Sequence, residues 1–335
     1  MKSKILITGA EGFIGSHISE YFNNNSNFEI HLTVMYNSFN SIGNLQKIFK
    51  NFDQKRVFIH FVDLTDQLFV SNLFKKHKFD YVLNLAALIS VPFSFESPNI
   101  YFNNNISLTQ NILNSSLENL KIKKIFQFSS SEVYGSAIYT PIDEKHPLQP
   151  QSPYSASKIS TDSLSLSYYY SYSLPVTIIR PFNCYGPRQS NRGVIPTIID
   201  QILNKNDNRI KLGNTSTFRD YTYVQDLAKI IFMLIASKKN LLGQTINIGT
   251  NKTHKIIDIV NTVNNITKSN KKVFIDNLRI RPKKAEVDLL RCDNRKLKKI
   301  IGKFKFTTFK DGLKKTINWK KDNELISLKN TNYFI

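Results

Sequence analysis

The sequence has little cysteine, few acidic residues and no long apolar run. Its 335 residues include two cysteines, Cys184 and Cys292, which are too few for a disulfide framework and show no metal-ligand spacing. We therefore expect a reducing, cytoplasmic compartment and no metal site. No stretch approaches the ~18 apolar residues of a membrane span, so we expect no membrane partner. The short apolar run after Met1 is interpreted as a buried first strand, because an export signal needs a longer one.

Acidic side chains are outnumbered, since 46 Lys and Arg face 25 Asp and Glu and give a net charge of +21. One interpretation is a polyanionic partner such as nucleic acid. The other is a lysine-rich composition whose charge is spread along the chain and is densest near its C-terminal end. No aromatic-interleaved nucleic-acid motif accompanies the lysines, so we favour the second interpretation and expect no nucleic-acid partner. A phosphate-bearing substrate would still benefit from the positive field.

The order of apolar segments predicts the fold class. Short apolar runs alternate with helical patterns in the first half, which is typical of βαβ units. We expect an α/β fold, with a Rossmann-type doubly wound parallel sheet and a smaller mixed α/β substrate-binding lobe. The predicted strands are 4–8, 30–34, 57–61, 81–85, 125–128, 175–179 and 245–248, and helices are predicted at 195–203, 226–235 and 308–319.

The rhythm of the sequence changes near Cys184, where prolines and glycines become frequent. We expect residues 1–183 to form an NAD(P)-binding domain that also contributes catalytic residues. Residues 184–325 are expected to form mainly the substrate-binding lobe. A return of part of this second segment to the first domain is left open.

A glycine-rich loop, TGAEGFIGSH at residues 8–17, follows the first predicted strand and opens the first predicted helix. Its glycines, Gly9, Gly12 and Gly15, are spaced for a tight turn, close approach to a pyrophosphate and close helix packing. The helix N-terminus offers free N–H groups to phosphates. Because strand, loop and helix come in the required order, we expect this loop to bind a dinucleotide, with Phe13 and Ile14 also in contact.

The acidic residue that usually binds the adenosine ribose is missing after the second predicted strand. Asn37 and Ser38 stand there instead, and we expect Asn37 to bind the ribose hydroxyls. Because no nearby arginine would hold a 2′-phosphate, the sequence favours NAD and leaves NADP open. Further along, Asp63 and Leu64 are placed for the adenine, and the small residues of Leu85-Ala86-Ala87 would let the cofactor pass.

A tyrosine and a lysine, Tyr154 and Lys158, lie four residues apart in YSASK. On a helix this spacing places both on one face. A nearby ammonium favours phenolate, so Lys158 is expected to lower the pKa of Tyr154 and make it a general base. The stretch FSSSEVYG supplies the hydroxyls of Ser130 and Ser131 and the carboxylate of Glu132. It follows the fifth strand, at the sheet edge where open α/β folds bind ligands.

Glu132 distinguishes two reaction types. A sugar 4-epimerase removes and returns a hydride and needs only a hydroxyl and a tyrosine. An enzyme that eliminates water across the fifth and sixth carbons also needs a base for the proton on the fifth. Glu132 fits that base, and the alternative is a solvated glutamate at a strand end.

Together these motifs resemble the extended short-chain dehydrogenase/reductases, which are nucleotide-sugar epimerases, dehydratases and decarboxylases. TGAEGFIGSH, LNLAAL, SSSEVYG, YSASK and RPFNCYGPRQ occur in the family's order, and RDYTYVQD and INIGT extend the resemblance into the second lobe. The stretches at 36–45, 187–199 and 279–296 most resemble 4,6-dehydratases of nucleotide-linked N-acetylglucosamine in legionaminic-acid-type pathways. The resemblance implies a homodimer built by helix packing that includes the helix carrying Tyr154.

The resemblance also implies residue roles. Tyr154 takes the proton of the sugar 4-hydroxyl while hydride passes to the nicotinamide, and Lys158 binds the nicotinamide ribose. Ser130 bonds the 4-oxygen, and Glu132 removes the proton of the fifth carbon before water leaves and hydride returns. The residues implied for the substrate are Asn183, Arg188, Val194, Arg219 and Arg281. For each arginine a surface salt bridge is the alternative, and Asn105 is either a support for the active-site backbone or a helix-surface residue.

The chain departs from many dehydratases of the family at one position. They carry Thr-Asp-Glu at the strand end, where the aspartic acid protonates the leaving hydroxyl, whereas this chain carries Ser130-Ser131-Glu132. Serine is too weak an acid for that role, so either Glu132 returns the proton or a water relays it. We therefore predict an NAD(P)-dependent 4,6-dehydratase acting on GDP- or UDP-N-acetylglucosamine. The alternatives are a 4-epimerase, a UDP-glucuronate decarboxylase and a non-catalytic dinucleotide sensor.

Overall fold

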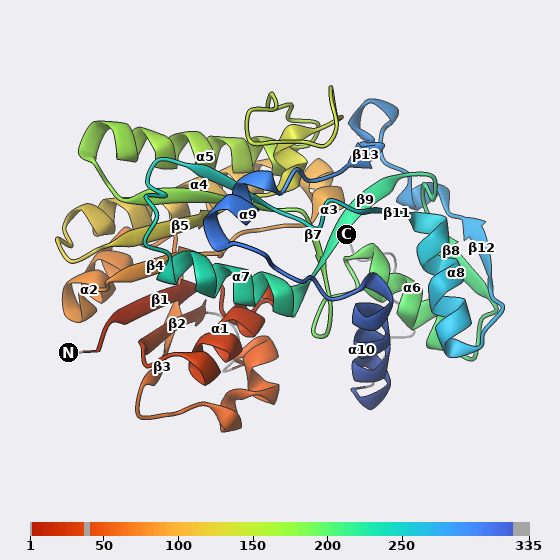
Figure 1. Cartoon of the computed structure of the whole chain (residues 1–335), viewed down its shortest axis with the longest axis horizontal. Coiled ribbons are helices and arrows are strands. Elements are labelled where there is room, and N and C mark those ends of the chain that lie inside the picture. Colours follow the sequence, from red (N-terminus) through yellow and green to blue (C-terminus); the bar gives the residue numbers. More distant parts are fainter. Residues whose placement is uncertain (1, 37–40, 324–335) are drawn as a thin grey trace.

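A seven-stranded parallel sheet forms the larger part of the molecule. A computed structural model describes residues 2–36 and 41–323. The strand order is β10-β6-β5-β4-β1-β2-β3, and every neighbouring pair is parallel. This arrangement confirms the predicted α/β fold (Figure 1). The strands are β1 (Lys4–Thr8), β2 (Glu29–Met35), β3 (Val57–Val62), β4 (Tyr81–Asn84), β5 (Lys124–Phe128), β6 (Val176–Pro181) and β10 (Thr245–Ile248).

Helices cover both faces of this sheet, which explains why its strands are apolar throughout. In β1, Ile5 and Ile7 face one core while Leu6 faces the other, as the two-residue period of a strand requires. The first core lies under α1 and α7, and the second under α2, α4 and α5. These helices are α1 (Phe13–Asn25), α2 (Gln67–His77), α4 (Pro98–Leu117), α5 (Pro153–Tyr172) and α7 (Val224–Ala236).

The strand order reverses at β1, which pairs with β2 on one side and with β4 on the other. In open α/β sheets, ligands bind outside the carboxyl ends of the strands at such a reversal. The glycine loop and the segments that follow β4 and β5 all leave the sheet at this edge. The fold therefore brings the predicted site segments together.

The smaller lobe is built from short sheets and three helices around a separate core. β9 pairs with β7, β11 and β13, and β8 pairs with β12. The strands are β7 (Asn183–Tyr185), β8 (Arg209–Leu212), β9 (Phe218–Tyr223), β11 (Thr253–Lys255), β12 (Lys272–Ile275) and β13 (Leu289–Leu290). The helices are α6 (Val194–Leu203), α8 (Ile256–Thr267) and α10 (Phe309–Asp322).

The chain passes between the two parts more than once. After β6 it enters the smaller lobe, and it then returns to the large sheet through α7 and β10. Helix α9 (Arg295–Ile301) also packs against α7 and β10, and Figure 1 shows it beside the sheet. The remaining short elements are α3 (Val91–Glu96) and 3₁₀ helices at Gly43–Lys47, Phe49–Asn51, Ser131–Tyr134, Asn277–Arg279 and Lys283–Ala285. Among the described helices, none combines the length and apolar character needed to cross a membrane.

Candidate active site

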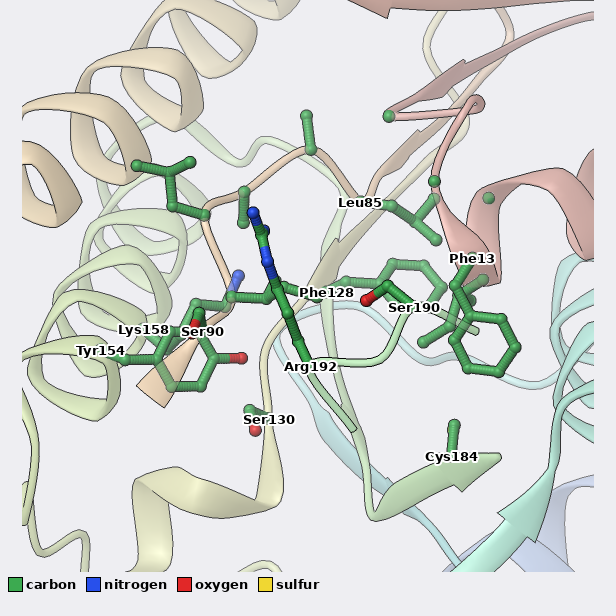
Figure 2. Close-up of a pocket in the computed structure, with 18 of the residues that line it drawn as sticks. Phe13, Leu85, Ser90, Phe128, Ser130, Tyr154, Lys158, Cys184, Ser190 and Arg192 are labelled. Carbon is green, nitrogen blue, oxygen red and sulfur yellow. The ribbon is translucent and has the colours of Figure 1, made fainter. Parts of the chain in front are cut away.

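A cavity of about 570 Å³ lies at the carboxyl edge of the sheet and is lined by residues of both lobes. Figure 2 shows Tyr154 and Lys158 at one end of it and Phe13 and Leu85 at the other. Most of the residues predicted from the sequence line this cavity, namely Gly9, Gly12, Phe13, Ile14, Gly15, Asp63, Leu64, Leu85, Ala86, Ala87, Ser130, Ser131, Glu132, Tyr154, Lys158, Asn183 and Arg281. Arg188, Val194 and Arg219 do not line it, and Asn37 and Ser38 lie outside the described residues.

The glycine loop has the geometry of a phosphate cradle. Gly9 has a φ of +62°, and a Cβ there would lie 3.0 Å from the backbone of Ala86. A Cβ on Gly15 would lie 2.2 Å from the carbonyl oxygen of Gly9, so a larger residue would push α1 off the loop. Gly12 precedes α1 without a side-chain cap. The N–H groups of the first helical turn therefore face the cavity edge without a side-chain partner from Gly12.

A buried polar chain fixes the strand ends below this loop. The Thr8 hydroxyl donates to Asn84 Oδ1 at 2.7 Å, and the Asn84 amide donates to Gln127 Oε1 at 2.8 Å. The Thr8 oxygen also accepts hydrogen bonds from the backbone N–H groups of Leu85 and Ala86, each at 3.0 Å. Because the Thr8 oxygen accepts from both backbone N–H groups, the Leu85-Ala86 segment is held where it can line the cavity.

Glu11 is a cavity residue that the sequence analysis missed. Its Oε1 atom accepts a hydrogen bond from the backbone N–H of Met35 at 3.0 Å, so the carboxylate reaches the end of β2. Its Oε2 atom is buried and has no hydrogen-bond partner in the described structure. Burial raises the pKa of this carboxyl. Glu11 thus places an acid where the sequence lacked one, but from the glycine loop instead of from the segment after β2.

The tyrosine and lysine lie on the first two turns of α5. Pro153 opens the helix and Ser152 caps it, with a reciprocal hydrogen bond to Ser155. This start places Tyr154 and Lys158 one turn apart, and both side chains point into the cavity (Figure 2). Tyr154 is 7% exposed and Lys158 4% exposed. Ser130 follows β5 by two residues and lies at the Tyr154 end of the cavity (Figure 2).

Burial governs the proton affinities of this pair. It raises the pKa of Tyr154, although the nearby Ser130 hydroxyl acts in the opposite direction. Burial also lowers the pKa of Lys158 to about 8, while Asp162 acts to raise it. The expectation that Lys158 would lower the pKa of Tyr154 is therefore not met in the protein alone. The physical reason is that the free-energy cost of moving a phenolate out of water exceeds the stabilisation that neighbouring groups give to it.

Glu132 and Arg281 form an ion pair in the same cavity. Arg281 Nη1 lies 3.4 Å from Glu132 Oε2, and the Glu132 side chain is 12% exposed. Arg219 is buried beside Glu286 at 3.9 Å. Burial lowers its pKa, and the nearby charges of Glu132 and Arg281 act on that pKa in opposite directions. Tyr221 shares this environment and has a buried hydroxyl without a hydrogen-bond partner in the described structure. Two arginines therefore stand next to the carboxylate that the sequence singled out.

The segment after β7 contributes Arg192 to the cavity where Arg188 was predicted. Arg188 is buried, and its guanidinium bonds Glu20 at 2.5 Å and the ring of His17. Arg192 is exposed and lines the cavity, where it extends across the opening near Tyr154 (Figure 2). Asn183 also lines the cavity, and its buried Oδ1 atom has no hydrogen-bond partner among the described residues. The sequence pointed to the correct stretch, but nothing in its pattern distinguished the two arginines.

Asn105 supports the cavity wall from α4. It is 1% exposed, and its Oδ1 accepts from the backbone N–H of Leu88 at 2.8 Å. Its amide donates to the Leu88 carbonyl at 3.1 Å and to Ser157 at 3.0 Å. Both backbone groups of a cavity-lining residue are therefore held by one side chain, and that side chain is tied to the helix of Tyr154.

The fold and this cavity define a dinucleotide-binding enzyme with a Tyr-Lys pair and a carboxylate beside it. The chain matches the family described as GDP-mannose 4,6 dehydratase over residues 6–316. It therefore belongs to this family of nucleotide-sugar dehydratases and epimerases, within the extended short-chain dehydrogenase/reductases.

Individual relatives carry either of two activities. The chain is 34% identical over 276 residues to dTDP-D-glucose 4,6-dehydratase of Dictyostelium discoideum, a match that covers 79% of this chain and 62% of that relative, less than two thirds of its length. It is 31% identical to a putative UDP-glucose 4-epimerase of Methanocaldococcus jannaschii, covering 95% of this chain and 99% of that protein. The crystal structure of dTDP-glucose 4,6-dehydratase from Bacillus anthracis, in complex with NAD, superposes with a TM-score of 0.84 at 26% identity, covering 96% of this chain and 97% of that one.

Proposed function

We propose that this chain is an NAD-dependent 4,6-dehydratase of GDP- or UDP-linked N-acetylglucosamine. The observation that carries the proposal is the placement of Glu132 in the same cavity as Ser130, Tyr154 and Lys158. Epimerisation at the fourth carbon needs no carboxylate there. Elimination of water across the fifth and sixth carbons needs a base, and we assign that role to Glu132.

The cavity fits a dinucleotide. The glycine loop allows close backbone approach, and the first turn of α1 offers N–H groups to a pyrophosphate. The free Oε2 of Glu11 suits a ribose hydroxyl and would repel a 2′-phosphate, which supports NAD over NADP. When bound, NAD would accept a hydride from the fourth carbon of the sugar and later return it to the sixth.

The chain's own residues account for the proton transfers. Ser130 bonds the 4-oxygen, and Tyr154 takes the proton of the 4-hydroxyl. The resulting ketone acidifies the neighbouring C–H bond, and Glu132 removes that proton. Glu132 then passes it to the hydroxyl that leaves the sixth carbon as water. When hydride returns to the sixth carbon, the fifth carbon takes up one proton, which matches the proton that Tyr154 removed from the 4-hydroxyl and now releases. Lys158 supplies a positive charge beside Tyr154, and Ser131 is buried and contributes a hydroxyl only.

The identity of the acid follows from the carboxylates of the cavity. Those that line it among the described residues are Glu11, Asp63 and Glu132. Glu11 lies at the glycine loop, and Asp63 lies beyond β3 with one oxygen already bonded to Thr65. Glu132 is the carboxylate on the strand end that also carries Ser130. We therefore assign both proton removal and proton return to Glu132.

We further propose that the substrate diphosphate is held by cations of the smaller lobe. Arg192 and Arg281 line the cavity, Arg219 lies directly behind Arg281, and Asn183 offers a polar atom without a partner. Guanidinium groups suit phosphate oxygens through paired hydrogen bonds. The proposed enzyme is a homodimer that packs through α4 and α5, which lie side by side (Figure 1) and expose Ile100, Tyr170 and Tyr172.

The test is to incubate the protein with NAD and GDP- or UDP-N-acetylglucosamine and to follow the product mass. Loss of one water from either sugar nucleotide supports the proposal. An unchanged mass with altered stereochemistry would make the chain a 4-epimerase. Release of carbon dioxide from UDP-glucuronate, with no turnover of either sugar, would make it a decarboxylase. The variant Tyr154→Phe is the control, and it should bind NADH but lose turnover.

A further inference from the structure

Three of the six histidines of the chain converge at a place remote from the cavity. His31 lies on β2, His60 on β3 and His77 at the last position of α2. One ring nitrogen from each lies within 4.8 Å of those of the other two. None of the three lines the cavity described above. The cluster sits on the sheet face that α2 covers, at the edge of the sheet formed by β3.

We propose that this cluster, the His31-His60-His77 site, binds one divalent transition-metal ion such as Zn²⁺ or Ni²⁺. Imidazole nitrogens suit Zn²⁺, Cu²⁺ and Ni²⁺, whereas Mg²⁺ and Ca²⁺ require oxygen ligands. Three protein ligands with one open position for water is a common zinc arrangement. The ion would tie together two neighbouring strands and the end of a helix.

The ring nitrogens of His31 and His60 face each other across a hydrogen bond, and a shared ion would take the place of its proton. His31 Nδ1 and His60 Nε2 lie 2.8 Å apart, and the two rings are almost parallel, with 4° between their planes. Two nitrogens bound to one tetrahedral Zn²⁺ lie about 3.3 Å apart, given Zn–N bonds of about 2.05 Å. The distance between the two nitrogens would therefore have to increase by only about 0.5 Å to admit the ion.

Glu29 sets the tautomer of His31. The Glu29 carboxylate pairs with Lys4 at 2.9 Å and also lies 2.9 Å from His31 Nε2. An ionised carboxylate only accepts hydrogen bonds, so Nε2 must be the donor. The lone pair of His31 then resides on Nδ1, which is the nitrogen that faces His60. A carboxylate behind a ligating histidine is the outer-shell arrangement that orients metal ligands and raises their basicity.

The charge state of the rings favours a metal as well. Burial lowers the pKa of His31 and of His60, each to about 4, and it lowers the pKa of His77. Neutral imidazoles are the form that ligates metals, and burial disfavours the charged form of all three rings. The charged groups that influence the cluster are Glu29, Lys4 and Lys76. His77 also ends α2, where the negative end of the helix dipole favours a cation.

The experiment uses the full chain without a histidine tag, and its readout is independent of enzymatic activity. Metal-free protein is titrated with ZnCl₂ against a chromophoric chelator, and thermal unfolding is followed at each zinc concentration. We expect one Zn²⁺ per chain and an unfolding midpoint that rises with zinc. Substituting Co²⁺ should give the intense visible absorption of a tetrahedral nitrogen site.

The variants are chosen to keep the fold intact. His60→Gln and His77→Gln change partly exposed rings and should each weaken zinc binding at least ten-fold, whereas buried His31 is left unchanged. Glu29→Gln should weaken it about 10–100-fold. The matched control is His254→Gln, because His254 is also partly exposed but lies on β11 against Phe309. Equal zinc binding by the wild type and the His60→Gln/His77→Gln double variant would overturn the proposal.

Discussion

Arg281 Nη1 lies 3.4 Å from Glu132 Oε2, although the two residues are 149 positions apart in the chain. Arg281 belongs to the smaller lobe and Glu132 follows a strand of the large sheet, so the ion pair joins the two lobes at the cavity. A diphosphate offers Arg281 a stronger and bidentate partner than one carboxylate oxygen. We therefore expect substrate binding to draw Arg281 away and to leave Glu132 free for proton transfer.

The substitution Glu132→Gln tests the role of this carboxylate. It keeps the size of the side chain and removes its basicity, so we expect dehydration to fall by about 10²–10⁴-fold. Oxidation of the fourth carbon does not require Glu132, so reduced nicotinamide should accumulate on the enzyme during the first turnover. Nicotinamide absorbance in a single-turnover experiment measures this. Full dehydratase activity in Glu132→Gln, with Tyr154→Phe inactive, would contradict the assignment.

Arg192 and Arg188 form a matched pair of substitutions. Arg192→Gln should raise KM for the sugar nucleotide about ten-fold or more, because a lost charge-assisted hydrogen bond costs about 1.5–3 kcal/mol. Its stability should be unchanged because Arg192 is exposed. Arg188→Gln should instead lower the free energy of unfolding by about 1–3 kcal/mol, since it breaks a largely buried pair with Glu20. Steady-state kinetics and denaturant unfolding separate the two effects, and the reverse pattern would refute the placement of the diphosphate.

We expect the buried charge of Lys158 to lower the stability of the fold while the same side chain is required for activity. Its folded pKa of about 8 lies below the value of 10.5 for free lysine, so the unfolded chain binds more protons between these pH values. Stability from this group therefore rises with pH across that window. At pH 7, Lys158→Met should raise the free energy of unfolding by about 1–3 kcal/mol while abolishing turnover.

Denaturant unfolding at several pH values measures the effect. The advantage of Lys158→Met over the wild type should shrink as pH rises from 8 towards 10.5. An advantage that is constant with pH would mean that packing, and not the buried charge, causes it. The matched control is Lys145→Met, which removes an exposed lysine instead of a buried one.

Glu11 is expected to discriminate between the two nicotinamide dinucleotides. Its free carboxylate oxygen should repel a 2′-phosphate, and Glu11→Gln should reduce the preference for NADH over NADPH at least ten-fold. Nicotinamide fluorescence titrations with the two cofactors measure both dissociation constants. If Glu11→Gln leaves their ratio unchanged, the discrimination must come from the segment after β2.

Local patterns predicted the strands well because each is an apolar run enclosed by helices. The predicted strand 245–248 coincides with β10. The site motifs were recognisable because a glycine loop, a strand end and a helix start each require particular residue types. Tyr154 and Lys158 are one turn apart in any helix. Their convergence with Ser130 and Glu132 follows from parallel strands ending at one edge.

Features that depend on tertiary packing could not be predicted from local sequence patterns. Glu11 was missed because only its contact with Met35 reveals that it reaches the end of β2. The pKa of Tyr154 was expected to fall, since spacing indicates a neighbouring charge but not the burial that outweighs it. The His31-His60-His77 site joins three separate segments, so no short spacing in the sequence indicates it.

The chain returns to the large sheet through α7 and β10, so the cofactor-binding domain is not formed by the first 183 residues alone. β10 covers the edge of β6, and Phe232 of α7 packs against Phe22 of α1. A fragment that ended at residue 183 would expose both an unpaired strand edge and an apolar helix face, which favours aggregation. Residues 1–183 are therefore not expected to fold as an independent unit. Chimaeras between relatives should exchange α7 and β10 together with this segment.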